Sequence, residues 1–189
     1  MKTKKVVPAK SKVSAKKRNT AKGKTVNTAP TEIHVLNGPN LNMLGFREPE
    51  LYGSETLPDL EKKLRASAKE SKSQVKVRFF QTNYEGDMLD YIHSLILGVG
   101  QKGGLGGVII NPAAWTHTSV ALRDAVLMLK PVPLVEVHLT NPAEREEFRH
   151  YSFIEDIVDY RVIGMGQDGY VEALRWLIAE LKKERLDVH

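Results

Sequence analysis

The 189-residue chain has no cysteine, and it has no apolar run near the roughly 18 residues that a membrane-spanning helix needs. The lack of cysteine excludes disulfides, thiolate metal sites and cysteine nucleophiles. No apolar signal-peptide stretch follows the basic start. These absences are compatible with a reducing compartment inside the cell, and we expect a cytoplasmic protein.

Acidic residues are missing from residues 1–31, which hold nine lysines and Arg18 and so carry +10. The other 18 of the 28 bases face 23 acids, a balance of −5. Residues 1–31 also have no aromatic side chain and no regular period, so we expect a disordered basic tail followed by one domain over residues 32–189. The tail could bind nucleic acid or another polyanion weakly by neutralising phosphates. A solubilising extension is the simpler interpretation, and an organelle address is a third, although lysine greatly outnumbers arginine.

From Glu32 onward, short apolar segments alternate with amphipathic segments of helical spacing. Strand, helix, strand, repeated with short links, indicates a parallel sheet covered on both faces. We therefore expect an α/β domain, a flavodoxin-like doubly wound five-stranded parallel sheet with helices on both faces. The expected strands are residues 33–37, 75–81, 106–112, 132–138 and a weaker 160–166, and the expected helices are 56–72, 85–99, 118–129 and 168–185.

The polar residues follow the carboxyl ends of the expected strands, where open α/β sheets place their sites. The first strand runs into LNGPNLNMLGFREPELYG (36–53), a connection of about 18 residues where about 2–6 are usual. The third strand ends at Asn111, and the fourth ends at Glu136 and His138. We expect the side chains of these three segments to meet at one rim of the sheet.

Several familiar chemistries have no motif in this sequence. No G-x-x-x-x-G-K-[ST] or G-x-G-x-x-G follows the first strand, and no G-x-S-x-G occurs. Metal binding by His117, His138 and Glu136 is conceivable, but no dense carboxylate cluster or paired-histidine helix supports it. Acid–base chemistry on a polar, anionic small molecule remains.

Two pairs of residues suit acid–base work. Arg47 lies five residues before Tyr52, and a nearby guanidinium favours the phenolate form of a tyrosine, a strong base. Glu136 and His138 are two apart on a strand, hence on one face, and a carboxylate beside an imidazole makes an acid usable near pH 7. Taken singly, an ordinary surface tyrosine and a structural ion pair are the alternatives.

Three segments resemble the signature segments of type II 3-dehydroquinate dehydratase: residues 36–53, NPAAWTHTSVALRD (111–124) and VEVHLTNPAEREEFRH (135–150). The resemblance covers about residues 32 to 183. It implies conversion of 3-dehydroquinate to 3-dehydroshikimate, a step of the shikimate pathway, by anti elimination of water through an enolate without metal or organic cofactor.

The resemblance also implies roles for individual residues. Tyr52 matches the base that removes the C2 proton, and Arg47 matches the arginine that keeps this tyrosine ionised. Asn40 matches the residue that stabilises the enolate oxygen through an ordered water. His138 matches the general acid that protonates the departing C1 hydroxyl, and Glu136 matches the carboxylate that orients it.

Further matches concern substrate binding and assembly. Asp124 matches a residue that reaches a neighbouring subunit's site, which implies a homo-oligomer, typically a dodecamer of trimers. The residues that match binders of the substrate's hydroxyls and carboxylate are Asn111, His117 and Arg149, together with the backbone of Leu139 and Thr140.

The chain departs from the family pattern at Trp115, at Tyr84 and in NPAEREEF (141–148). None of these positions matches an acid or base, and they could alter substrate affinity or subunit packing. Three alternatives stay open: a non-catalytic flavodoxin-like binding homologue, a polyanion-associated protein with incidental activity, and a flavin-binding electron carrier. The resemblance leaves open whether the reaction serves biosynthesis or quinate breakdown.

Overall fold

The computed structural model describes residues 29–46, 53–100 and 103–187. Five parallel strands form one sheet in the order β2-β1-β3-β4-β5, which confirms the predicted flavodoxin-like topology. The strands are β1 (Thr31–Asn37), β2 (Val75–Gln81), β3 (Leu105–Asn111), β4 (Leu134–His138) and β5 (Tyr160–Ile163).

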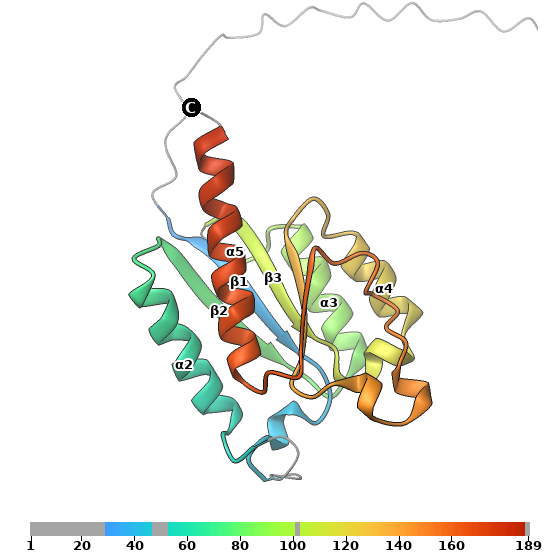
Figure 1. Cartoon of the computed structure of the whole chain (residues 1–189). Helices are drawn as coiled ribbons and strands as arrows, with labels where there is room; N and C mark the ends of the chain where they lie inside the picture. Colours follow the sequence, from blue (N-terminus) through green and yellow to red (C-terminus); the bar gives the residue numbers. More distant parts are fainter. Residues whose placement is uncertain (1–28, 47–52, 101–102, 188–189) are drawn as a thin grey trace, which may run out of the picture.

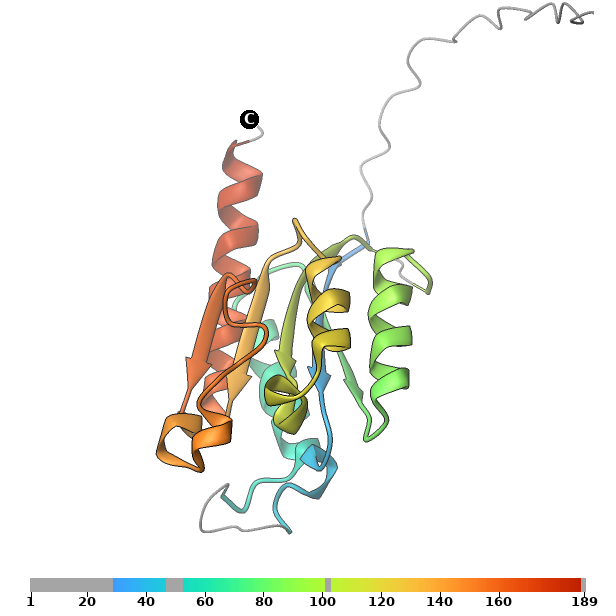
Figure 2. The same ribbon diagram turned by 90° about the vertical axis from the view of Figure 1, so that its right-hand side faces the viewer.

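Helices cover both faces of this sheet (Figures 1 and 2). α2 (Leu57–Glu70) and α5 (Asp168–Asp187) pack on one face, and α3 (Glu85–Ile96) and α4 (Val120–Leu127) pack on the other. Successive residues of a strand point to opposite faces, so Val35 joins the first core and Leu36 joins the second. Each face therefore has its own apolar core, and the strand ends are left for polar residues.

Some element boundaries differ from the predicted ones because of a glycine, a proline or a capping serine. β5 ends at Ile163 because Gly164 and Gly166 take positive φ values of 77° and 54°, outside the strand region. β4 begins at Leu134 because Pro133 has no N–H to donate to a ladder. The predicted helix 118–129 spans Val120–Leu127 in the structure, and it begins at Val120 because the Ser119 side chain caps it by accepting from Leu122 N at 2.8 Å.

The loops at the carboxyl ends of the strands hold short 3-10 helices that the sequence did not predict. In the described residues these are Leu41–Met43, Ala113–His117, Pro142–Glu144 and Glu147–Arg149. Leu41–Met43 lies in the cyan segment of Figure 1, and Pro142–Glu144 and Glu147–Arg149 lie in the orange segment. Most of the predicted tail, residues 1–28, lies outside the described part of the chain. Among residues 29–46, 53–100 and 103–187, no helix is long and apolar enough to cross a membrane.

Candidate active site

The site begins where the loop after β1 crosses the end of β3. Asn37 and Asn111 are paired in register at the last position of their strands. Gly38 then turns against the β3 exit, with its N–H donating to the Asn111 carbonyl at 2.8 Å. A Cβ on Gly38 would lie 2.4 Å from the Pro112 carbonyl oxygen, so a side chain cannot fit without a shift of backbone. This contact directs the following loop over the strand ends.

A cavity of about 180 Å³ opens at this rim. The structure brings most of the predicted site residues to its wall: Asn40, Asn111, His117, His138, Leu139, Thr140 and Arg149. Lining residues that the sequence analysis did not single out are Pro39, Leu41, Met43, Leu44, Ala113, Ala114, Pro142 and Arg145. All of them lie within residues 36–53, 111–124 and 135–150. Because each of these segments follows a strand end at the same rim, the sequence could have indicated them as lining residues.

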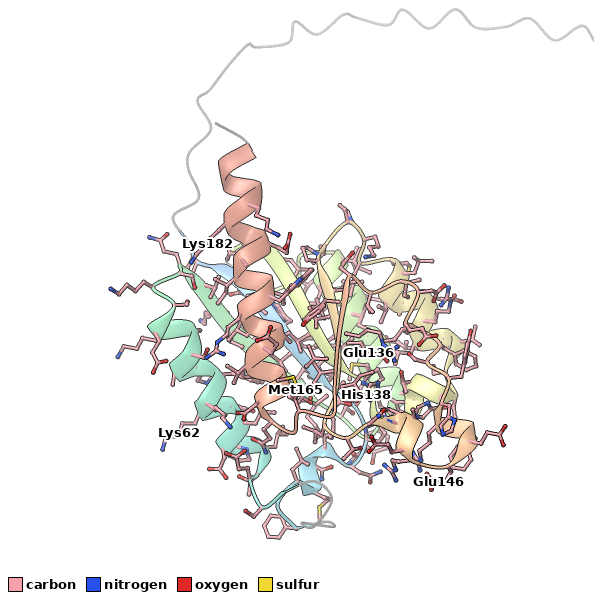
Figure 3. All side chains as sticks on the ribbon, viewed as in Figure 1. Lys62, Glu136, His138, Glu146, Met165 and Lys182 are labelled. Carbon is pink, nitrogen blue, oxygen red and sulfur yellow. The ribbon has the colours of Figure 1, made fainter. Side chains whose placement is uncertain are left out.

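Glu136 and His138 point the same way from β4, as their spacing predicts (Figure 3). His138 Nε2 lies 2.9 Å from Glu136 Oε1. The same oxygen accepts hydrogen bonds from Thr116 Oγ1 at 2.6 Å and Ser152 Oγ at 2.7 Å, and Oε2 accepts from Arg161 Nε at 2.7 Å. Sequence analysis missed these three partners, which come from other loops and from β5.

The carboxyl group of Glu136 is fully buried yet ionised. Burial by itself would raise its pKa, but the bonds from His138, Thr116 and Ser152 favour the charged form and bring the pKa down from 4.5 to about 2. Glu136 is therefore a permanent anion at neutral pH. It fixes the ring of His138 at the cavity wall.

His117 faces the same cavity as a neutral base. Its Nδ1 lies 2.7 Å from the Tyr151 carbonyl oxygen, which can only accept, so Nδ1 carries the proton and Nε2 is the acceptor nitrogen. Burial lowers the pKa of His117 and outweighs the hydrogen bond to the Tyr151 carbonyl, which favours the charged form; the Arg149 charge lowers the pKa further. A neutral imidazole at this position suits hydrogen bonding to a substrate hydroxyl.

Asn111 is held by a buried chain of polar groups. Its Oδ1 accepts from Ala113 N at 3.1 Å, and its Nδ2 donates to Tyr170 Oη at 2.9 Å. Burial raises the pKa of Tyr170, so the phenol stays protonated and donates to Asn37 Oδ1 at 2.7 Å. The Asn111 amide is thereby fixed in one orientation at the cavity wall. Tyr170 and Asn37 were not predicted as site residues.

The predicted oxyanion residue and cation are also oriented by neighbours. Asn40 takes a left-handed conformation, with φ of 66°, and its N–H donates to Asn83 Oδ1 at 2.9 Å. Arg149 lines the cavity, and its Nε donates to Glu146 Oε2 at 2.7 Å. The first contact fixes the backbone of Asn40, and the second fixes the side chain of Arg149.

Four predicted site residues are not among those that line this cavity. Glu136 is fully buried behind His138 and does not itself reach the cavity. Asp124 lies exposed on α4 and does not line the cavity. Arg47 and Tyr52 lie outside the described residues. Within the described part of the chain, no group of three or more histidine, aspartate or glutamate side chains is arranged to hold a metal ion.

The model of the family "Dehydroquinase class II" matches residues 31–178. This chain belongs to that family. The match covers every strand, the cavity and the candidate residues at its wall.

Individual 3-dehydroquinases and 3-dehydroquinate dehydratases match this chain over nearly their whole length. The chain is 48% identical to 3-dehydroquinate dehydratase 2 of Pseudomonas putida over 81% of this chain and 96% of that protein. It is 46% identical to catabolic 3-dehydroquinase 2 of Neosartorya fischeri over 79% and 93%. The crystal structure of type II dehydroquinase from Butyrivibrio crossotus superposes with a TM-score of 0.72 at 38% identity, covering 78% of this chain and 97% of that one.

Proposed function

We propose that this protein eliminates water from 3-dehydroquinate to give 3-dehydroshikimate, a step of the shikimate pathway. The observation that carries this proposal is His138 at the wall of a cavity in a class II dehydroquinase, with the buried Glu136 carboxylate behind its ring. A buried carboxylate anion beside an imidazole makes a general acid, and the reaction needs one to release hydroxide as water.

In the proposed reaction, Tyr52 as phenolate takes the proton from C2, and the electron pair forms an enolate with the C3 carbonyl. Arg47 keeps Tyr52 ionised, and Asn40 stabilises the enolate oxygen through a water. The enolate then collapses, the C1–O bond breaks, and His138 gives its proton to the leaving hydroxyl. Because Nε2 of His138 is held by Glu136, Nδ1 is the nitrogen that delivers this proton.

Substrate binding follows from the donors at the cavity wall. Arg149 and the backbone of Leu139 and Thr140 take the carboxylate in this proposal, while Asn111 and His117 take hydroxyls. A neutral His117 and an oriented Asn111 amide support these roles, since each presents a defined donor or acceptor. The site then needs no metal ion for binding or for the elimination.

The proposed assembly is a homo-oligomer, a dodecamer of trimers, in which Asp124 reaches the site of a neighbouring subunit. The exposed position of Asp124 on α4 supports this role. Mass measurement by light scattering tests the assembly. We also keep weak polyanion binding by residues 1–31 as a proposal. Deleting this segment should leave kinetics unchanged and remove any salt-sensitive binding to nucleic acid.

The test of the activity is the rise in enone absorbance after 3-dehydroquinate is added to the purified protein, with and without EDTA. We expect a rise that the chelator does not change. Tyr52→Phe should abolish it while leaving substrate binding nearly intact, because the proton abstraction is lost and the pocket is not. No rise from a folded, assembled wild-type protein would reduce it to a binding homologue.

A further inference from the structure

Arg161 contacts the Glu136 oxygen that His138 does not. Its Nε donates to Glu136 Oε2 at 2.7 Å, while Oε1 lies 2.9 Å from His138 Nε2. The strand register places Glu136 and Arg161 side by side on β4 and β5. On its outer side, Arg161 Nη1 donates to Glu155 Oε2 at 2.7 Å. Three side chains of alternating charge, Glu155, Arg161 and Glu136, therefore run from the surface to His138 at the cavity wall.

This arrangement has an electrostatic consequence for the acid. Glu136 is fully buried, so water screens its interactions little. The guanidinium of Arg161 is always charged. A permanent positive charge on one side of Glu136 disfavours a second positive charge on the other side, which is the imidazolium of His138. Without Arg161, Glu136 would hold the His138 proton more tightly.

We propose that Arg161 is a positioning residue that acts through Glu136: it holds the carboxylate in place and keeps His138 a stronger acid than the Glu136–His138 pair alone would make it. The effect on catalysis rests on the proposed function, which assigns His138 the acid role. The effect on the imidazole itself does not depend on that assignment.

Other charged or titratable groups face His138 from the remaining described elements. The ring of His117 lies 6.4 Å from that of His138, centroid to centroid. Arg145 and Arg149 line the same cavity, and Arg149 is paired with Glu146. None of these groups is altered by replacing Arg161 or Glu155. A change in the His138 titration in such variants therefore reports on the Arg161 side of the carboxylate.

Arg161→Gln separates charge from hydrogen bonding. The glutamine amide nitrogen stands at the same bond position along the side chain as arginine Nε, so it can still donate to Glu136 without a charge. We expect the NMR titration of His138, followed in protein labelled at histidine ¹³Cε1, to move to higher pH by about 0.5–1 unit. The signal that is lost in His138→Asn identifies the resonance.

Glu155→Gln should have the opposite effect. It removes the outer carboxylate from Arg161 and leaves the guanidinium less compensated, so the His138 titration should move to lower pH by roughly a few tenths of a unit. Glu155 is 40% exposed, which explains the smaller size. Opposite shifts in two variants of one ion pair would not follow from a purely structural role.

Arg78→Gln is the matched control. Arg78 donates to Glu32 Oε1 at 2.7 Å from the adjacent strand, and Glu32 is two residues before His34 on β1. Arg78 and Arg161 are similarly exposed, at 34% and 31%. The same type of ion pair is thus removed away from the cavity wall. This variant should leave the His138 titration and the kcat/KM pH profile unchanged.

The kinetic readout follows the NMR readout. In Arg161→Gln, the limb of the kcat/KM pH profile that requires protonated His138 should move to higher pH, by the same amount as the NMR titration of His138. A His138 titration within about 0.2 unit of wild type, or a shift of the same sign in both variants, overturns the proposal. If Arg161→Gln does not fold, the Glu155→Gln variant tests the proposal alone. A His138 titration that moves to lower pH supports it, and one that stays in place or moves to higher pH overturns it. Absence of turnover by wild type would refute the proposed function and leave the NMR result standing.

Discussion

Nε2 of His138 lies 2.9 Å from Oε1 of Glu136, and both side chains are buried at the end of β4. The bond uses one imidazole nitrogen and leaves the other for the cavity. Thr116 and Ser152 donate hydrogen bonds to the same carboxylate oxygen. Glu136 and, through it, the ring of His138 are therefore held by groups from three segments of the chain.

Replacing His138 with Asn should lower kcat about 10²- to 10⁴-fold, because positioned acid–base groups contribute about that much. KM should change less, since binding depends mainly on other cavity residues. Steady-state kinetics with 3-dehydroquinate measure both. His93→Asn, at an exposed position on α3, is the control and should behave as wild type. A His138→Asn enzyme that keeps most of its kcat would remove His138 as the acid.

The Glu136 carboxylate should make the free energy of unfolding depend on pH in the acidic range. Its pKa is about 2 in the folded protein against an ordinary 4.5, so its contribution is present above about pH 4.5 and is lost as the pH falls through about 2. The full contribution is on the order of 3 kcal/mol. Urea unfolding at pH 7 and pH 3 measures this effect as the difference between wild type and Glu136→Gln. That difference should shrink at pH 3, and a constant difference would contradict the account.

Tyr170→Phe removes the hydroxyl that joins Asn37 and Asn111. The free energy of unfolding should fall by about 1–3 kcal/mol, because two buried amide groups lose a partner. KM for 3-dehydroquinate should also rise about 3- to 10-fold, since the Asn111 amide is no longer held toward the substrate. Urea unfolding and steady-state kinetics measure the two effects.

Tyr91→Phe is the control for this prediction. It removes a hydroxyl that lies 3.0 Å from His34 Nδ1, away from the cavity wall. A comparable loss of stability with unchanged KM is expected. Equal KM values in both variants would show that Tyr170 does not act on the substrate through Asn111.

Gly38→Ala should destabilise the protein and disturb the cavity together. The new Cβ would meet the Pro112 carbonyl oxygen at 2.4 Å, so the backbone of one of the two loops has to move. A loss of about 1–3 kcal/mol in unfolding free energy is expected, with a fall in kcat/KM. Gly86→Ala in α3, which meets no atom within 4 Å, should be neutral or slightly stabilising. Equal effects of the two substitutions would show that the close approach is not what requires glycine.

The order of strands and helices was predictable from sequence because it depends on local periodicity. Apolar runs and helical spacing identified all five strands and all four long helices, and alternation along a strand placed Glu136 beside His138. Element ends were less predictable. The stop of β5 at Ile163, for example, depends on backbone angles at Gly164 that the sequence allows but does not require.

By itself, the sequence determined the fold class, the family resemblance and the rim at which polar residues gather. The tertiary structure alone decided which distant side chains complete the site. Arg161 meets Glu136 across 25 residues through strand register, and Tyr170 meets Asn37 across 133 residues through the packing of α5 on the sheet. Such partners follow from how elements pack against one another, and packing is not encoded in the spacing of residues within one segment.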